Sequence, residues 1–295
     1  MPTFPSFDGV RLAYHTAGEG APVVCLAGGP GRASAYLSGI IACLPGRTVV
    51  RLDSRGTGDS AAPDDPSTYR AAAAVHDVEA LLEHLGRERP ALLAHSSAAN
   101  TAMLYALQHP DRISHLILIA PSSRLVGIDV EDFHQALLLR THEEWYPEAR
   151  AAIDRWVSST TMAETIPHRV PAAPFYYGRW DDQARAHAAT EPEQIGLAAA
   201  EGFYADFDFD TAGIRAALGR LPIPVLVITG ELDPFPTPRT GKQLAAVFAH
   251  GTSFVQPSGG HFPWLDAPST LAVAMQDHLE GEGGSPQKRT QPHTT

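Results

Sequence analysis

The chain has 295 residues, of which 44% are hydrophobic and 19% are charged, and its formal net charge is −11. This length and balance suit one large globular domain, or a core domain with an inserted subdomain. The acidic charge argues against nucleic acid and anionic membranes as partners, because both are negatively charged.

Membrane and secretory segments are also not indicated. No apolar run reaches the roughly 18 to 20 residues that a membrane-spanning helix needs. Residues 1–8 lack both the basic start and the apolar stretch of a secretory signal. Cys25 and Cys43 are the only cysteines, which is too few for a four-ligand zinc site. We therefore predict a cytoplasmic protein with two reduced, buried thiols.

The sequence predicts β-strands along much of the chain. A β-hairpin is predicted over residues 8–20, where Val10, Leu12 and Tyr14 alternate and glycines follow. Short, continuously apolar runs then predict strands that are covered on both faces, as in a mostly parallel sheet. These runs are residues 22–27, 48–52, 91–94, 113–119, 224–229 and 253–256.

Helical segments separate most of these strands. Residues 69–85 place apolar side chains at helical spacing, and Gly86 is the predicted stop of that helix. Strand–helix alternation of this kind predicts right-handed βαβ units and a doubly wound α/β sheet.

The alternation stops between residues 123 and 219, a stretch rich in alanine and aromatic residues. We interpret residues 123–219 as a helical cap over the site, and residues 1–122 and 220–280 as the α/β core. Residues 281–295 are rich in Gly, Pro, Gln and Thr, which predicts a disordered tail.

The strongest chemical signal is Ser96. It follows a predicted strand and precedes a predicted helix, and alanine stands two positions away on each side, at Ala94 and Ala98. A serine nucleophile at such a sharp turn needs small neighbours, since strand and helix backbones nearly touch there. A serine that only caps the helix is the alternative. Ser97 is the weaker choice of nucleophile, because His95 would then stand at the crowded inner position.

A glycine-rich turn follows the first buried strand, with Gly-Gly-Pro-Gly at residues 28–31. Such a turn lets a backbone N–H point into the site. We assign Gly29 as one donor of an oxyanion hole and the N–H of Ser97 as the other. A phosphate loop is excluded, since neither of the glycine patterns that bind phosphate is present.

An acid and a histidine complete the pattern. Asp233 follows the predicted strand 224–229, and His261 follows the predicted strand 253–256 on a glycine loop. Sites in doubly wound sheets form outside the carboxyl ends of the strands. The order Ser96, Asp233, His261 is that of the catalytic triad in α/β-hydrolases, so we predict the α/β-hydrolase fold.

This triad predicts a serine hydrolase. His261 takes the serine proton, Asp233 fixes the imidazole tautomer, and an acyl-enzyme forms and is hydrolysed. No cofactor and no metal are expected for this chemistry. The acidic stretch 206–210 is interpreted as a linker, because Thr211 and Ala217 stand where a calcium loop needs glycine and glutamate.

Five segments together resemble the proline iminopeptidase branch of the α/β-hydrolases. They are the Gly-Gly-Pro-Gly turn, the Asp-Ser-Arg-Gly-Thr-Gly-Asp-Ser run at 53–60, the turn at Ser96, Gly-Glu-Leu-Asp at 230–233 and Gly-His-Phe-Pro-Trp at 260–264. The resemblance covers residues 8–122 and 220–280. It implies an aminopeptidase whose cap glutamates bind the substrate's free amino group, and Glu201, in Glu-Gly-Phe-Tyr, is the residue it assigns to that role.

The family pattern is not complete. Ala27 replaces the histidine of its HGGPG segment, alanines replace glycines around Ser96, and Ser97 replaces a tryptophan. Three functions therefore stay open. The first is an aminopeptidase or amidase acting on small N-terminal aminoacyl groups of a short peptide-like substrate. The second is an esterase or lactonase with an apolar pocket, and the third is a non-catalytic, ligand-binding member of the fold.

Overall fold

The structure is a computed structural model that describes residues 1–86 and 89–281. The predicted tail, apart from Gly281, lies outside the described residues. Within them, no helix combines the length and the apolar character that crossing a bilayer requires.

The core of the molecule is an eight-stranded sheet with the strand order β1-β2-β4-β3-β5-β6-β7-β8. The strands β3 to β8 run parallel to one another. The strand β2 is antiparallel to both of its neighbours, β1 and β4. The bounds are β1 Thr3–Pro5, β2 Arg11–Ala17, β3 Ala21–Leu26, β4 Arg47–Leu52, β5 Ala91–His95, β6 Leu116–Ile119, β7 Val225–Gly230 and β8 Gly251–Gln256. All six predicted strands are present, and the prediction of a mostly parallel α/β sheet is confirmed. The last of them, β8, is not covered as predicted, because it lies at the edge of the sheet and only Gln256 is buried.

The predicted hairpin over residues 8–20 is wrong. This stretch holds a single strand, β2, which pairs with β1 on one side and with β4 on the other. The turn after β2 does not return the chain to β2. At Gly18 and Gly20 it passes so close to the start of β4 that a Cβ on either residue would lie within 2.4 Å of a backbone oxygen. The strand β4 therefore lies between β2 and β3.

Helices cover both faces of the sheet, because successive side chains of each strand point to opposite faces. Alternate residues such as Val24 and Leu92 pack with α1, α2, α9 and α10 in one core cluster. Their neighbours Val23 and Leu93 pack with η1, α11 and α12 in the other. The bounds are η1 Ser34–Cys43, α1 Ala74–Leu85, α2 Ala98–Gln108, α9 Thr211–Leu218, α10 Pro238–Ala245, α11 Pro263–Asp266 and α12 Pro268–Glu280.

The helix predicted over residues 69–85 begins later than expected. The short 3-10 helix η2, Pro66–Tyr69, comes first, and α1 starts at Ala74. Its predicted end is correct, since Gly86 adopts the left-handed conformation with φ of 60° and its N–H bonds carbonyls of the last turn.

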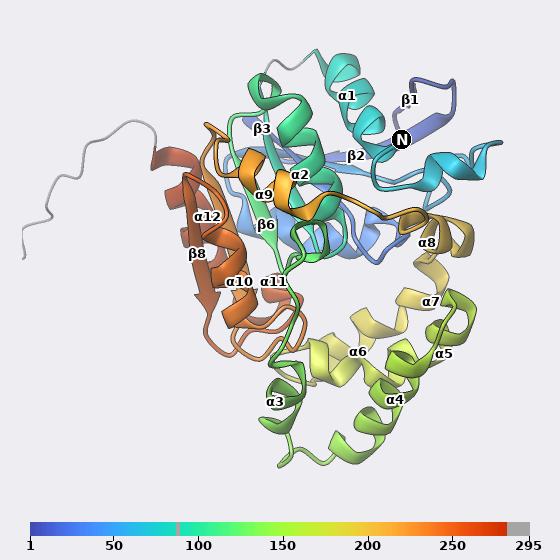
Figure 1. Cartoon of the computed structure of the whole chain (residues 1–295), viewed down its shortest axis with the longest axis vertical. Coiled ribbons are helices and arrows are strands. Elements are labelled where there is room, and N and C mark those ends of the chain that lie inside the picture. The colour runs from blue at the N-terminus through green and yellow to red at the C-terminus, as the bar shows by residue number, and fades with distance from the viewer. Residues whose placement is uncertain (87–88, 282–295) are drawn as a thin grey trace, which may run out of the picture.

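A run of helices connects β6 to β7 and lies to one side of the sheet (Figure 1). Its bounds are α3 Phe133–Leu138, α4 Tyr146–Ser158, α5 Met162–Ala172, α6 Asp182–Ala189, α7 Glu191–Gln194 and α8 Leu197–Phe203. It has a small apolar cluster of its own, which includes Ile153 and Phe175. The division at residues 123 and 219 stays a prediction. The packing of α9 into the first core cluster favours an earlier end of the cap.

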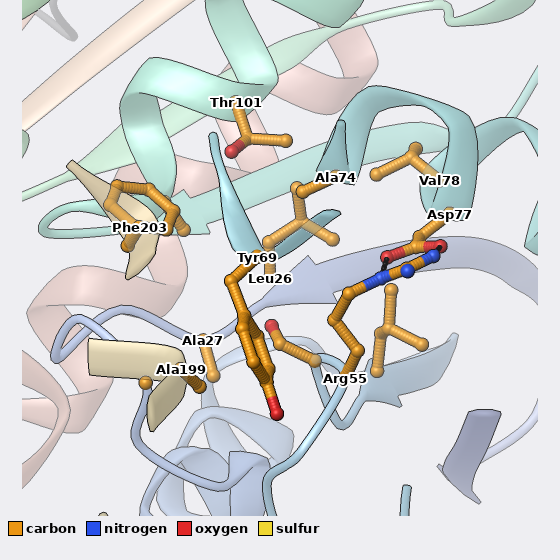
Figure 2. Close-up of a pocket in the computed structure, with 14 residues that line it drawn as sticks. Leu26, Ala27, Arg55, Tyr69, Ala74, Asp77, Val78, Thr101, Ala199 and Phe203 are labelled. Carbon is orange, nitrogen blue, oxygen red and sulfur yellow. Dashed lines mark hydrogen bonds and ion pairs between the residues drawn. The ribbon is translucent and has the colours of Figure 1, made fainter. Parts of the chain in front are cut away.

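A buried ion pair joins the N-terminal segment to the sheet's helices. The Arg55 guanidinium bonds the Asp77 carboxylate, with Nε to Oδ2 at 2.8 Å, and its Nη1 lies 2.7 Å from Asp8. Both Arg55 and Asp77 are 2% exposed. Figure 2 shows this pair beside Tyr69, at the edge of a cavity of about 40 Å³, which holds little more than one water molecule.

We predict that Asp77→Ala lowers the free energy of unfolding by about 3 kcal/mol or more, because it leaves a buried guanidinium without its main partner. Urea denaturation measures the change. The control is Asp154→Ala, which removes an exposed ion pair with Arg150 and should cost far less. Equal losses in the two variants would contradict the buried pair's role.

Candidate active site

Ser96 lies at a strained corner between β5 and α2. Its φ of 55° is in the left-handed region, which is uncommon for a residue with a side chain. Strand β6 and the loop after it fix the backbone of Ser96. The Ser96 N–H donates to Ile119 O, and the Ser96 carbonyl accepts from Ser122 N, both at 3.0 Å. The small neighbours fit this geometry, because Ala94 is 0% and Ala98 is 4% exposed.

Three predicted residues come together at this corner. The hydroxyl Oγ of Ser96 lies 3.0 Å from His261 Nε2, and His261 Nδ1 lies 2.8 Å from Asp233 Oδ2. Asp233 is fully buried, and its second oxygen accepts from the N–H of Phe235 at 2.9 Å. An ionised carboxylate only accepts, so Nδ1 carries the proton and Nε2 is free to accept from the serine hydroxyl.

The loop that carries His261 is fixed from two sides. The His261 N–H donates to Tyr176 O at 2.7 Å, which ties it to the helical segment after β6. The N–H groups of Gly260 and Gly178 both donate to Asp266 Oδ2, at 2.7 Å and 3.3 Å. The pKa of Asp266 is raised above its usual value, because the effect of burial exceeds that of these two hydrogen bonds, which lower it.

The two predicted oxyanion donors lie beside Ser96. Gly29 and Ser97 line the same cavity as Ser96 and His261. Within the described parts of the chain, neither of their N–H groups has an intramolecular acceptor. The turn presses against the corner, since a Cβ on Gly28 would lie 2.5 Å from His95 O. Two free N–H groups beside a serine can bind a developing oxyanion.

A cavity of about 310 Å³ opens at Ser96, near the lower end of the range for small-molecule sites. One wall comes from the β6–β7 helices and is largely apolar, with Trp156, Met162 and Tyr176. Phe235 and Phe262 add to it from the loops after β7 and β8.

Glu201 does not reach this cavity. It lies on α8 with its side chain exposed, and it is not among the lining residues. The carboxylate that does line the cavity is Glu191, which is 8% exposed and pairs with Arg169 and, at 3.8 Å, with Arg32. Nothing in the sequence around residue 191 distinguishes it, so only the folded chain identifies it.

A buried hydrogen-bond chain links the oxyanion turn to the catalytic loop. The Gly28 N–H donates to Tyr36 Oη at 2.8 Å, and that hydroxyl lies 2.8 Å from His95 Nδ1. His95 Nε2 donates to His261 O at 2.9 Å. Since a carbonyl only accepts, Nε2 carries the proton, and the tyrosine hydroxyl must donate to Nδ1. Burial, and next the charge of His261, hold the pKa of His95 well below its usual value.

His187 extends this chain to the helical segment. Its Nε2 donates to Tyr36 O at 3.2 Å, and Tyr177 Oη donates to its Nδ1 at 2.7 Å. Burial, and next the charge of Arg32, lower the pKa of His187 to about 4. The imidazole is therefore neutral near pH 7.

Possible metal ligands cluster elsewhere. His15, Asp53 and Asp59 bring ligand atoms within 4.8 Å of one another. The Asp53 carboxylate already accepts from the N–H groups of Ser34 and Asp59 and from His15, which fits a structural anchor. In the acidic stretch 206–210, Asp206 pairs with Arg70 and Asp210 caps α9. The interpretation of that stretch as a linker fits these contacts.

Known proteins resemble this chain over nearly its whole length. The family model for the alpha/beta hydrolase fold matches residues 21–268. A proline iminopeptidase of Lactobacillus helveticus is 26% identical, over 93% of this chain and 96% of that protein.

Two solved structures share the fold. The proline iminopeptidase of Mycobacterium smegmatis has a TM-score of 0.70 at 23% identity, covering 95% of this chain and 97% of that one. The esterase RhEst1 from Rhodococcus sp. ECU1013 has a TM-score of 0.73 at 21% identity, covering 96% and 99%.

We predict that Tyr36→Phe lowers the free energy of unfolding by about 1 to 3 kcal/mol, because it strips a buried N–H of its acceptor and a buried imidazole of its donor. The comparison is Tyr14→Phe, whose hydroxyl makes only a 3.3 Å contact with His84. Chemical denaturation of both variants tests the difference. An equal loss of unfolding free energy in the two variants would count against the role of the Tyr36 hydrogen bonds.

We predict that stability falls as the pH drops from about 6.5 towards 4, partly through His187. In this window the unfolded imidazole binds a proton that the folded one, with its pKa lowered to about 4, does not. His187→Gln should flatten the decline by up to about 1.4 kcal/mol per pH unit. Urea midpoints at pH 7 and pH 5 measure this. An unchanged pH dependence in the variant would refute it.

Proposed function

The chain belongs to the family with the alpha/beta hydrolase fold, and from that premise we propose that it is a serine hydrolase that cleaves small carboxylic esters or lactones through an acyl-enzyme. The observation that carries the proposal is the pair of contacts from Ser96 Oγ to His261 Nε2 at 3.0 Å and from His261 Nδ1 to Asp233 Oδ2 at 2.8 Å.

The first half-reaction forms the acyl-enzyme. Ser96 Oγ attacks the carbonyl carbon while its proton moves to His261 Nε2. The carbonyl oxygen becomes an oxyanion that accepts hydrogen bonds from the N–H groups of Gly29 and Ser97. The imidazolium, stabilised by Asp233, then gives its proton to the departing alcohol as the carbon–oxygen bond breaks.

The second half-reaction reverses these roles. His261 takes a proton from a water molecule, and the hydroxide attacks the acyl carbon. The same two N–H groups hold the second oxyanion. The proton then returns from the imidazolium to Ser96 Oγ, and the carboxylic acid leaves.

The cavity's charge favours an ester over an aminoacyl amide. An amine-binding site needs a carboxylate that is free to meet the ammonium group. The carboxylate at the cavity, Glu191, already serves two arginines, and Glu201 lies outside it. The apolar wall of Trp156 and Met162 suits the hydrocarbon part of an acyl or alcohol group.

An aminopeptidase or amidase is the second candidate. Similarity over 93% of the chain to a proline iminopeptidase favours it, as does the Gly-Gly-Pro-Gly turn at residues 28–31. The same triad would serve amide cleavage, with His261 protonating the departing amine. A purely ligand-binding role is the weakest alternative, because a serine hydroxyl that bonds an imidazole oriented by a carboxylate is a reactive arrangement.

We predict that Ser96→Ala lowers kcat for 4-nitrophenyl butyrate by several orders of magnitude, on the scale of about 10⁶ for loss of a serine nucleophile. Ser158→Ala is the matched control, since that exposed hydroxyl only bonds Arg155 O at the end of α4. Release of 4-nitrophenol measures both variants, and Ser96→Ala with wild-type turnover would refute the proposal.

The same assay separates the candidates. The wild type should prefer 4-nitrophenyl butyrate to prolyl-4-nitroanilide, and the reverse preference would establish the aminopeptidase. Failure of a fluorophosphonate to label Ser96, with no turnover of either substrate, would leave only the ligand-binding role.

A further inference from the structure

The loop that follows β6 fixes the backbone of Arg124 beside the nucleophile, while the side chain of Arg124 is exposed. Ser122, two residues earlier, donates its N–H to Ser96 O at 3.0 Å. On the other side, the Leu125 N–H donates to Asn100 Oδ1 at 3.1 Å, which ties the loop to α2. Arg124 therefore projects from an anchored backbone, and it lines the cavity that contains Ser96.

The guanidinium of Arg124 rests on aromatic faces. Its Cζ lies 4.6 Å from the centre of the Tyr204 ring and 5.1 Å from that of Phe207. Stacking of this kind occupies the faces of the planar group and leaves the N–H groups at its edge free to donate. It also limits the side chain's motion, so less entropy is lost when a ligand binds.

Arg124 is a charge at the cavity that no carboxylate of the described residues pairs with. In the part of the chain that the structure describes, no carboxylate or carbonyl oxygen bonds its guanidinium. Arg169, which also lines the cavity, shares the Glu191 carboxylate with Arg32. Two arginines thus meet one carboxylate, and Arg124 adds a further positive charge, in a protein whose net charge is −11.

We propose that the substrate carries a carboxylate group, which Arg124 binds in the cavity. This inference rests on the proposed ester hydrolysis and adds the class of ester: an acidic one, with the scissile carbonyl at Ser96 and the acid at Arg124. A guanidinium edge donates two parallel hydrogen bonds to a carboxylate. An ammonium group would be repelled by the same guanidinium.

The test compares an anionic ester with a neutral one in each of two matched pairs. Mono-4-nitrophenyl succinate and 4-nitrophenyl butyrate differ by a carboxylate on the acyl side. The pair 4-carboxyphenyl butyrate and phenyl butyrate differ by one on the alcohol side. The measured quantity is the ratio of kcat/KM for the anionic ester to kcat/KM for its neutral partner, so effects common to both cancel.

In Arg124→Gln, at least one of the two ratios should fall about 10-fold to 100-fold, the scale of a charge-assisted hydrogen-bond pair. Arg124→Lys keeps the positive charge but loses the planar guanidinium, so its ratio should lie between those of the wild type and Arg124→Gln. The control is Arg220→Gln. Arg220 is exposed and precedes β7, so it lies near the amino ends of the parallel strands and away from the site. If both ratios in Arg124→Gln equal those of the wild type, the inference is overturned.

A binding measurement separates this inference from the proposed function. If wild type hydrolyses none of the four esters, ester hydrolysis is refuted, and calorimetric titration of Ser96→Ala with the same esters decides the binding claim. Tighter binding of the anionic ester, lost in the Ser96→Ala, Arg124→Gln double variant, supports recognition of a carboxylate. Equal binding of anionic and neutral partners overturns it.

Discussion

The left-handed backbone of Ser96 is the constraint on which the site depends. A serine with φ of 55° between a strand and a helix must be held there by its surroundings. Hydrogen bonds from β6 and the loop after it hold the corner, and the close approach of Gly28 excludes any larger residue at that position. The same geometry lifts the serine hydroxyl out of the sheet, towards the loops that carry Asp233 and His261. Alanine at positions 94 and 98 is small enough for it.

A series of buried hydrogen bonds connects parts of the site that lie far apart in the sequence. Tyr36 joins the oxyanion turn to His95, and His95 joins the serine corner to the backbone of His261. His187 brings the helical segment into the same chain through Tyr36 O. Because the carbonyl oxygens of His261 and Tyr36 can only accept, these hydrogen bonds fix the tautomers of both buried histidines. The catalytic geometry and the position of the helical segment are therefore coupled.

The helices between β6 and β7 line much of the cavity. They supply an apolar wall and a carboxylate, Glu191, that two arginines neutralise. The chain resembles a proline iminopeptidase in sequence, yet the residue that the resemblance assigned to amine binding, Glu201, lies outside the cavity. The charge that remains free there is positive. A shared fold therefore does not fix which substrate a protein accepts.

The sequence by itself determined the α/β fold, four strand ends that are followed by candidate site residues, and the chain order of Ser96, Asp233 and His261. It could do so because buried parallel strands, tight turns and small residues around a nucleophile each leave a local pattern. The single strand β2, the later start of α1 and the roles of Glu191, Tyr36 and Arg124 were decided only by the tertiary structure. Those features depend on which side chains meet across a hundred residues or more, and on which charges find partners. No local spacing records that information.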